Sequence, residues 1–420
     1  MTGPLPVDDS AVDERSLRYA GWRVAAASGI GVLFASMAAY GFSILLKPLS
    51  QEFAWSRETA STAYSCFTLA SALAAPVLGP LIDRRGPLRV VLPCMVAIGL
   101  GIASLSTMTA SPARLYILFT ALGLAVIGAS PLAFSRTVST WFDRRRGSAL
   151  AIVISGGAVG SMVHPPAIDA LVRMAGWRTA CVVMGAVVLS VGVPPVVLFV
   201  RERQARASTS PAAVSGATMS EAVRSRIFWT LIVVIGGAAI AFNGVVVHIV
   251  SLLTDRGVAS GSAAMALSLM GAFGLGGRLI TGWLIDRFRA TYVSAALLAL
   301  AAAGIVLLSS TASFAMALVA AAMIGFGMGG ELDVTPFLLS RYFGLRSLST
   351  LYGVCWMAMG GGAAIGPLAM GRAFDANGSY DGMLVNLAGE TLLAALLMLT
   401  LPRYRRSIPE QPESITVGAS

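Results

Sequence analysis

Twelve apolar segments follow one another along the chain, and they constrain its fold more than any other feature. A helix needs about 20 apolar residues to cross the roughly 30 Å hydrocarbon core of a bilayer. Residues of the hydrophobic types make up 56% of the chain and charged residues only 12%, a composition that soluble globular proteins do not have. The sequence therefore predicts an all-α membrane protein with 12 transmembrane helices. The segments lie at roughly 22–46, 58–82, 88–108, 113–140, 147–171, 177–200, 227–253, 261–285, 291–311, 313–340, 347–371 and 383–401.

The positive charges are divided unequally between the two sides of these segments. If both termini are cytoplasmic, 21 of the 30 Lys and Arg residues fall inside and seven outside, so the positive-inside rule predicts this multi-pass orientation. Because most of the basic residues lie in loops between the spans, the net charge of +10 is explained by membrane orientation. We therefore expect no nucleic-acid partner. The first 21 residues lack the pattern of a cleavable signal peptide. Arg replaces Lys almost throughout, which suggests a GC-rich bacterium and its cytoplasmic (inner) membrane.

A polar segment rich in Ser, Ala and Arg separates the first six spans from the last six. We expect a tail at 1–21, a six-helix bundle at 22–200, a cytoplasmic linker at 201–226, a second bundle at 227–402 and a tail at 403–420. The halves are similar, because Gly79-Pro-Leu-Ile-Asp83-Arg84 returns as Gly282-Trp-Leu-Ile-Asp286-Arg287 at an offset of 203. The pair Trp141-Phe142 returns as Tyr342-Phe343 at an offset of 201. Paired halves are typical of transporters that bind their substrate between the repeats.

The first of these repeats also carries a resemblance to a known family. Residues 79–89, GPLIDRRGPLR, resemble the loop signature of the major facilitator superfamily. The stretches at 141–149, 156–160 and 176–178 resemble its monocarboxylate porter branch, which includes oxalate/formate exchangers. The resemblance implies two pseudo-symmetric six-helix bundles, a central cavity and alternating access.

Charged residues at the cytoplasmic ends of helices are candidates for gating, because arginines and neighbouring helix termini offer partners to the acids there. Arg136, only about 8 Å from the inner edge of its span, can reach the interface and is placed in the same structural or gating group. The predicted gating residues are Asp83, Arg84, Arg89, Asp286, Arg287 and Arg136.

Arg278 lies nine residues before Arg287, which puts it roughly 14 Å into the hydrocarbon core. A guanidinium there costs at least about 2.5 kcal/mol unless it faces a partner, a watery cavity or an anionic substrate. By its spacing to Gly282 and Asp286 it resembles the helix-8 arginine that holds a substrate carboxylate in monocarboxylate transporters. A planar fork of donors suits that task. The alternative is a permanent structural pair with an acid of the tenth span.

Glu331 and Asp333 are two acids well inside the tenth span. Residues two apart on a helix point to different sides, so we expect only one of them to face Arg278 or the substrate. Burial favours the neutral acid, whereas a nearby arginine favours the carboxylate. A substrate that draws the arginine away would therefore promote proton uptake. Both acids are candidates for proton coupling, and a purely structural role for both is the alternative.

Departures from the family pattern bear on the substrate. Gly274 stands where animal members carry an acid, Tyr40 stands in the place of a lysine, and the second cation of oxalate exchangers is missing from the eleventh span. A small dianion held between two cations is therefore disfavoured, and we expect a monocarboxylate with a larger, aromatic body. The predicted substrate-binding residues are Arg278, Tyr40, Tyr64, Asn243, Tyr352 and Trp356.

The sequence offers no sign of other chemistry. Its four cysteines have no metal-ligand spacing, no motif cradles a nucleotide phosphate, and no nucleophile, base and orienting group converge. We expect no cofactor, no metal and no enzymatic activity, and a gradient as the energy source. His164 and His248 could relay protons, although lone buried histidines more often serve packing.

The leading hypothesis is proton-coupled symport of an organic monocarboxylate by alternating access, with the carboxylate, protons and the lipid bilayer as partners of a monomer. Anion exchange is the alternative, followed by export of drugs or apolar solutes. A sensor on a transporter scaffold is a further possibility, since fold alone does not fix function.

Overall fold

The computed structural model describes residues 16, 19–142, 145–201, 217–310, 313–344 and 347–403, and the regular structure of these residues is helical. Helices of the first half are α1 (Ala20–Ala35), α2 (Met37–Phe53), α3 (Arg57–Arg85), α4 (Pro87–Ser104), η2 (Leu105–Thr107), α5 (Pro112–Gly128), α6 (Pro131–Trp141), α7 (Arg146–Val187), η3 (Val188–Gly192) and α8 (Val193–Phe199). Helices of the second half are α9 (Met219–Val223), α10 (Arg226–Asp255), α11 (Ser260–Arg287), α12 (Ala290–Ser309), α13 (Phe314–Phe343), α14 (Leu348–Asn377) and α15 (Asp381–Thr400).

Each of the twelve predicted spans coincides with helix. Within the described ranges, nine helical stretches are long and apolar enough to cross a membrane, and one of them, Ser148–Phe199, has 52 residues. This stretch holds two spans, because the helix is interrupted at Gly176, whose φ of 79° favours glycine. The remaining two spans are α3 and the broken pair α5 and α6. The 29-residue α3 carries Ser and Thr residues at intervals, and it forms part of the wall of a central cavity described below.

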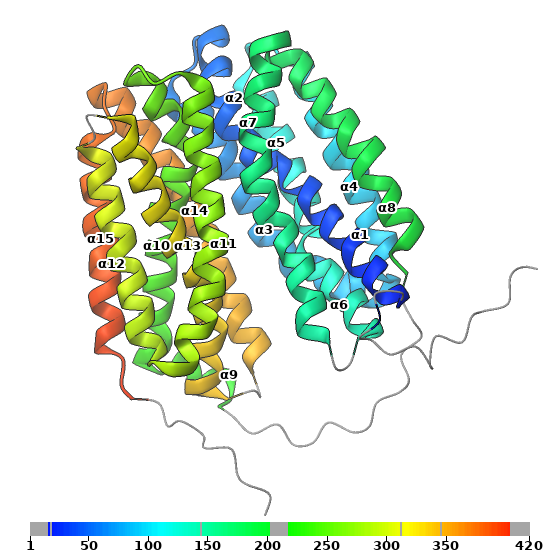
Figure 1. Ribbon diagram of the computed structural model, residues 1–420, viewed down its shortest axis with the longest axis vertical. Helices are drawn as coiled ribbons and strands as arrows, with labels where there is room; N and C mark the ends of the chain where they lie inside the picture. The colour runs from blue at the N-terminus through cyan, green and yellow to red at the C-terminus, as the bar shows by residue number, and fades with distance from the viewer. Residues whose placement is uncertain are drawn as a thin grey trace, which may run out of the picture.

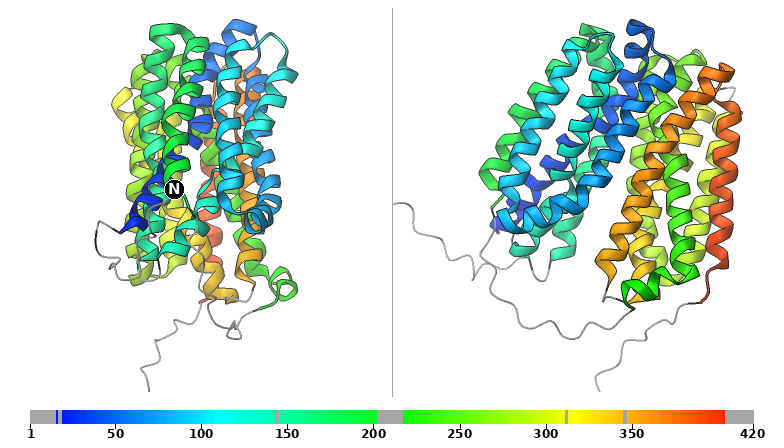
Figure 2. Two further views of the ribbon diagram at one scale, coloured as in Figure 1. Left: turned by 90° about the vertical axis from the view of Figure 1, so that its right-hand side faces the viewer. Right: turned by 180° about the vertical axis from the view of Figure 1, so that it is seen from behind.

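The helices form two groups, with α1–α8 in one and α10–α15 in the other (Figure 1). The groups touch where α3 lies against α14, α7 against α11 and α2 against α10. They diverge towards the end at which α8 finishes and α9 begins, here called the linker end, as the views from the front and from behind agree (Figures 1 and 2). The opposite end is called the far end.

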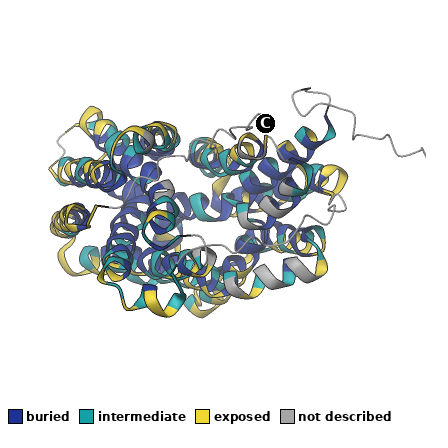
Figure 3. Cartoon of the chain, turned by 90° about the horizontal axis from the view of Figure 1, so that it is seen from below, coloured by how far each residue is buried: buried dark blue, intermediate teal, exposed yellow. Residues whose placement is uncertain are grey.

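Burial follows what a bilayer-embedded bundle requires. Seen from the linker end, buried residues occupy the inside of each group and exposed residues its outer surface (Figure 3). Large apolar side chains on that surface include Ile117 (71% exposed), Leu279 (69%) and Leu73 (61%). In a soluble protein such exposure would be costly, whereas lipid tails solvate these side chains.

Glycines set the tight packing inside the second half. A Cβ added at Gly329 would stand 1.8 Å from the carbonyl oxygen of Gly274, and one at Gly277 would stand 2.2 Å from that of Phe326. Helices α11 and α13 therefore approach backbone to backbone, as small residues permit in membranes.

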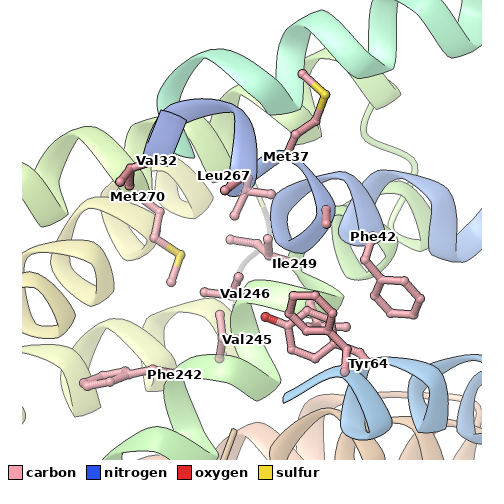
Figure 4. Close-up of a cluster of buried hydrophobic side chains, with 14 of the residues drawn as sticks. Val32, Met37, Phe42, Tyr64, Phe242, Val245, Val246, Ile249, Leu267 and Met270 are labelled. Carbon is pink, nitrogen blue, oxygen red and sulfur yellow. The ribbon is translucent and has the colours of Figure 1, made fainter. Parts of the chain in front are cut away.

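Apolar side chains also join the halves. Val32, Met37 and Phe42 from α1 and α2 lie in one cluster with Val246 from α10 and Leu267 from α11 (Figure 4). The core therefore continues across the boundary between the halves.

Candidate functional site: a central cavity

A cavity of about 410 Å³ lies between the two halves. Its walls are mostly apolar and include Phe67 of α3, Phe242 of α10 and Met328 of α13, and a few polar groups such as Thr68 and Thr335 interrupt them. Cavities of roughly 300–1,000 Å³ with this mixture suit a small organic molecule. The site is thus built by six elements or their ends, three from each half: α2, α3 and the α5–α6 junction, and α10, α13 and α14.

Four of the predicted substrate-binding residues line this cavity: Tyr40, Asn243, Tyr352 and Trp356. The rings of Tyr352 and Trp356 lie one helical turn apart on α14 with centroids 6.2 Å apart. Asn243 on α10 donates its amide hydrogen to the carbonyl oxygen of Ala239 at 3.0 Å. The side-chain oxygen of an asparagine can accept further hydrogen bonds.

Tyr64 lies behind the wall of the cavity. Its side chain is 5% exposed, and its ring packs against those of Phe42 and Phe67 at centroid distances of 5.4 and 5.6 Å. Phe67 lines the cavity, whereas Tyr64 does not. Direct contact between Tyr64 and a substrate stays a prediction.

Glu331 is a buried acid that lines the cavity from α13. Its Oε2 accepts a hydrogen bond from the Ser294 hydroxyl of α12 at 2.8 Å. A carboxylate has about four acceptor positions, so this single bond leaves the group with capacity to bind a proton. Asp333 belongs to the same helix, and its side chain lies outside the described part of the structure.

Arg278 occupies the face of α11 that meets the first half. Gly271, two turns earlier on the same face, would place an added Cβ 2.2 Å from the Ser161 hydroxyl of α7. Arg278 lies roughly 10 Å further along that face towards the linker end. It is half-buried and does not line the cavity, whereas Tyr40 of α2 does. Contact between Arg278 and a substrate in the cavity stays a prediction.

The predicted gating residues are placed only in part. Arg89 is exposed near the start of α4, and the exposed Arg287 lies over the Trp283 ring, 4.3 Å from its centroid. For Asp83, Arg84, Arg136 and Asp286 the structure places the backbone on α3, α6 and α11, and their side chains lie outside the described ones. The gating roles of all six stay predictions.

Charged residues from both halves meet at the far end, and we call this set the far-end seam. Asp255 accepts from Lys47 Nζ at 2.7 Å and from Arg57 Nη2 at 3.1 Å. Arg372 Nε donates to Glu58 at 2.6 Å. Each of these pairs joins one half to the other, so they hold the halves together at this end. The seam comprises Lys47, Arg57, Glu58, Asp255, Arg372 and Asp375.

Asp375 contributes to the seam in a different way. Its Oδ1 and Oδ2 accept the backbone N–H groups of Arg57 and Glu58 at 2.9 and 2.7 Å. These two groups open α3 and have no partner within the helix, and the carboxylate also meets the positive end of the helix dipole. A side chain from the second half thus caps a helix of the first.

His248 forms a buried counterpart to the seam. Its Nε2 lies 3.0 Å from the carbonyl oxygen of Pro367 and 3.0 Å from the Ser61 hydroxyl of the first half. Since a carbonyl can only accept, Nε2 carries the hydrogen. Nδ1 then accepts from the Tyr380 hydroxyl at 3.1 Å, and burial raises the pKa of Tyr380 so that this hydroxyl stays protonated. With both nitrogens bonded, His248 has the geometry of a structural latch.

Comparison with known proteins adds the family. The profile of the Major Facilitator Superfamily matches residues 28–367 of the 420. The chain belongs to the major facilitator superfamily. The predicted fold class is thereby confirmed, and the family and fold are those of membrane transporters.

Among curated relatives, the superfamily member "Uncharacterized MFS-type transporter YhjX" of Escherichia coli (strain K12) is 28% identical over 342 residues, covering 79% of this chain and 83% of the relative. "Monocarboxylate transporter 11" of Homo sapiens is 27% identical over 403 residues, covering 91% and 83%. The resemblance to monocarboxylate transporters is therefore confirmed. A solved bacterial homolog of the human lysosomal transporter Spinster, inward-facing and unoccupied, superposes with a TM-score of 0.70 at 15% identity, covering 91% of this chain and 95% of that one, and it supports the fold alone.

Membership of the superfamily relates the arrangement of the two halves to a transport mechanism. Major facilitator transporters work by alternating access, in which the two halves rock about a central site. In this structure the halves are joined by the seam and by His248 at the far end, and they diverge at the linker end (Figure 1).

Sequence reasoning missed the seam entirely. Lys47, Arg57 and Arg372 are three of the seven cations that the positive-inside count places outside, and no partner was predicted for them. The signal was the presence of acids beside these few outside cations, namely Asp255 and Asp375 at the ends of the seventh and eleventh spans. It also missed Phe67 and Phe242, since an apolar residue in an apolar span carries no mark of facing a cavity.

Proposed function

We propose that this protein is a proton-coupled symporter of an organic monocarboxylate, located in the inner membrane of a bacterium with both termini cytoplasmic. The observation that carries the proposal is Glu331, a buried acid in the wall of a mostly apolar cavity. Arg278 lies outside the lining of this cavity, on the neighbouring helix α11. The proposal therefore combines a proton-binding group in the cavity wall with one cation on an adjacent helix. The similarity to proteins named monocarboxylate transporters supports the substrate class.

The cavity suggests how the two groups work together. A substrate carboxylate draws the Arg278 guanidinium towards the cavity and binds its fork of donors, with the Tyr40 hydroxyl as a further donor. The organic body of the substrate packs among Phe67, Phe242 and Trp356. Glu331 is carried neutral through the closure of the cavity, because a buried charge without a partner is expensive. A proton therefore travels with each carboxylate.

The predicted orientation in the membrane decides which conformation of the transport cycle the structure represents. If the linker end faces the cytoplasm, as the distribution of arginines predicts, the structure is inward-facing. The seam then closes the outer side, where the substrate enters in the other half of the cycle.

The test is uptake of labelled aliphatic and aromatic monocarboxylates into proteoliposomes under an imposed pH gradient. We expect uptake driven by an acidic exterior. Arg278→Gln removes about two charge-assisted hydrogen bonds and should weaken substrate binding by roughly a hundredfold. Arg226→Gln, an exposed arginine at the start of α10, is the matched control and should leave uptake unchanged.

Glu331→Gln separates the proton from the substrate. It keeps the size of the side chain and an acceptor for Ser294, but it cannot take up a proton. We expect it to abolish the response to the pH gradient while exchange of labelled for unlabelled substrate continues. Uptake by the unaltered protein that ignores the gradient would refute proton coupling.

Anion exchange remains the competing function. It is favoured by the same cation and the same cavity, since neither requires a proton. Uptake by the unaltered protein that depends on carboxylate inside the vesicle and does not respond to the pH gradient would establish exchange in place of symport.

A further inference from the structure

A second hollow lies on the outer flank of the second half, away from the central cavity. It has a volume of about 600 Å³ and is lined from α11, α12 and α13 and by the α11–α12 connection. Its apolar walls are Leu284, Val293, Ala296, Leu297, Leu300 and Phe326. Four residues form its mouth at the linker end: Arg287, Phe288, Arg289 and Tyr292.

The hollow is a groove that runs along one stripe of α12. Its lining residues on this helix recur three and four positions apart, from Arg289 at the N-cap to Leu300. Eleven residues of helix correspond to roughly 16 Å, which is about half the thickness of the hydrocarbon core. The groove therefore has the length of one bilayer leaflet, with its charge at the mouth and its apolar part below.

The mouth has the composition of a membrane interface. The Arg289 guanidinium lies 4.6 Å from the centroid of the Tyr292 ring, and its Nη1 donates to the Tyr292 hydroxyl at 2.8 Å. Arg287 is held over Trp283, which is 53% exposed. Tyr and Trp at this level are typical of the headgroup region. A guanidinium carries five donors, so the bond to Tyr292 leaves most of those on Arg289 for another acceptor.

We propose that this groove, which we call the flank groove, is a binding site for an anionic phospholipid. Arg287 and Arg289 contact the phosphate and the headgroup, and an acyl chain lies along the stripe of α12 from Val293 to Leu300. Basic pockets between transmembrane helices bind anionic headgroups by this chemistry. The N-terminus of α12 adds its positive dipole end beside the phosphate.

The experiment measures lipid binding by the purified full-length protein in detergent. Native mass spectrometry compares phosphatidylglycerol with phosphatidylcholine of the same acyl chains, and thermal stability is followed in parallel, because a bound ligand stabilises the folded state. We expect phosphatidylglycerol to bind more tightly and to raise the unfolding temperature further. Inorganic phosphate and dihexanoyl phosphatidylglycerol, which lacks long chains, should do neither.

Two kinds of variant locate the site. Arg287→Gln with Arg289→Gln should weaken phosphatidylglycerol binding by about 30-fold, because each arginine near an anionic surface contributes about 1 kcal/mol. Arg289→Gln alone should weaken it about fivefold. Arg224→Gln with Arg226→Gln removes the same charge from exposed positions at the same end and should have no effect.

Ala296→Phe tests the apolar part without changing charge. Ala296 is exposed at the groove, so a larger side chain fills the groove without disturbing the core, and we expect weaker binding of long-chain lipid. Equal affinity in the double variant and its control would overturn the proposal, and so would equal binding of phosphatidylcholine. Full stabilisation by inorganic phosphate would also overturn it, since the site would then bind a free anion. None of these measurements depends on transport.

Discussion

Asp375→Asn is the most direct test of how the far-end seam governs the two states of the transporter. The carboxylate of Asp375 accepts two backbone N–H groups that begin α3 in the opposite half. Asparagine keeps the size of the side chain, but it offers one acceptor and presents an amino group to the second N–H. It also removes a negative charge from the N-terminus of a helix. The substitution therefore weakens a contact made only when the far end is closed.

The size of the effect follows from the contacts. A hydrogen bond to a charged group contributes about 1.5–3 kcal/mol when it is shielded from water. Asp375 is exposed, so we discount each bond to about 0.5–1 kcal/mol. Loss of both then destabilises the closed far end by about 1–2 kcal/mol, which changes the ratio of closed to open molecules by roughly 5- to 30-fold.

Double electron–electron resonance, which measures the distance between two spin labels, can follow the ratio of closed to open molecules. Met174 of α7 is 85% exposed, and Ala315 of α13 is exposed at the same end of the other half. Cysteines at these two positions, in a chain whose four native cysteines are replaced by serine or alanine, report the separation of the halves. We expect the population with the longer distance to rise in Asp375→Asn.

Asp381→Asn is the matched control, because it removes the same charge at the same end but pairs with Arg256 of its own half. It should leave the distances unchanged. If both variants give the distribution of the unaltered protein, the seam does not set the equilibrium and the reasoning from its contacts is wrong.

Three further predictions concern packing, the cavity and the latch. Gly329→Ala forces a Cβ against the Gly274 carbonyl and should lower the free energy of unfolding by about 1–3 kcal/mol. Gly276→Ala, with open space around it, should leave the free energy of unfolding unchanged. Thermal unfolding distinguishes the two variants. Trp356→Ala should weaken binding of aromatic monocarboxylates about fivefold, through loss of about 1 kcal/mol of ring contact, and spare short aliphatic ones, as competition for uptake would reveal. His248→Ala removes hydrogen bonds to three buried groups, one of them in the first half, so spin labels at the far end should show more open molecules. An unchanged distribution would contradict the latch.

The positions of the spans could be predicted from the sequence because crossing a bilayer is a local requirement. The predicted span at 227–253 corresponds to α10, Arg226–Asp255, and that at 313–340 to α13, Phe314–Phe343. The length of an apolar run and the charges that end it determine both. The breaks at Ser36 and Ser130 were not predicted, because a short interruption within an apolar run leaves its length and hydropathy almost unchanged.

The site could be predicted only where a residue was conspicuous for its type. Glu331 and Asn243 are polar residues in apolar spans, which made them candidates for the site, and both line the cavity. The seam depends on partners far apart in the chain, such as Arg57 and Asp375, which are separated by 318 positions. No local pattern identifies such a pair before the halves are placed together.

The seam also differs from the His248 latch in its exposure to dissolved ions. Arg372 and Glu58 have side chains 64% and 38% exposed, so salt in the surrounding medium weakens their attraction. His248 is completely buried, and its neutral bonds are not screened. Ionic strength at the far end therefore weakens the far-end seam and does not weaken the His248 latch. A dilute medium therefore favours the closed far end, and a saline one weakens the exposed pairs of the seam while it leaves the latch intact.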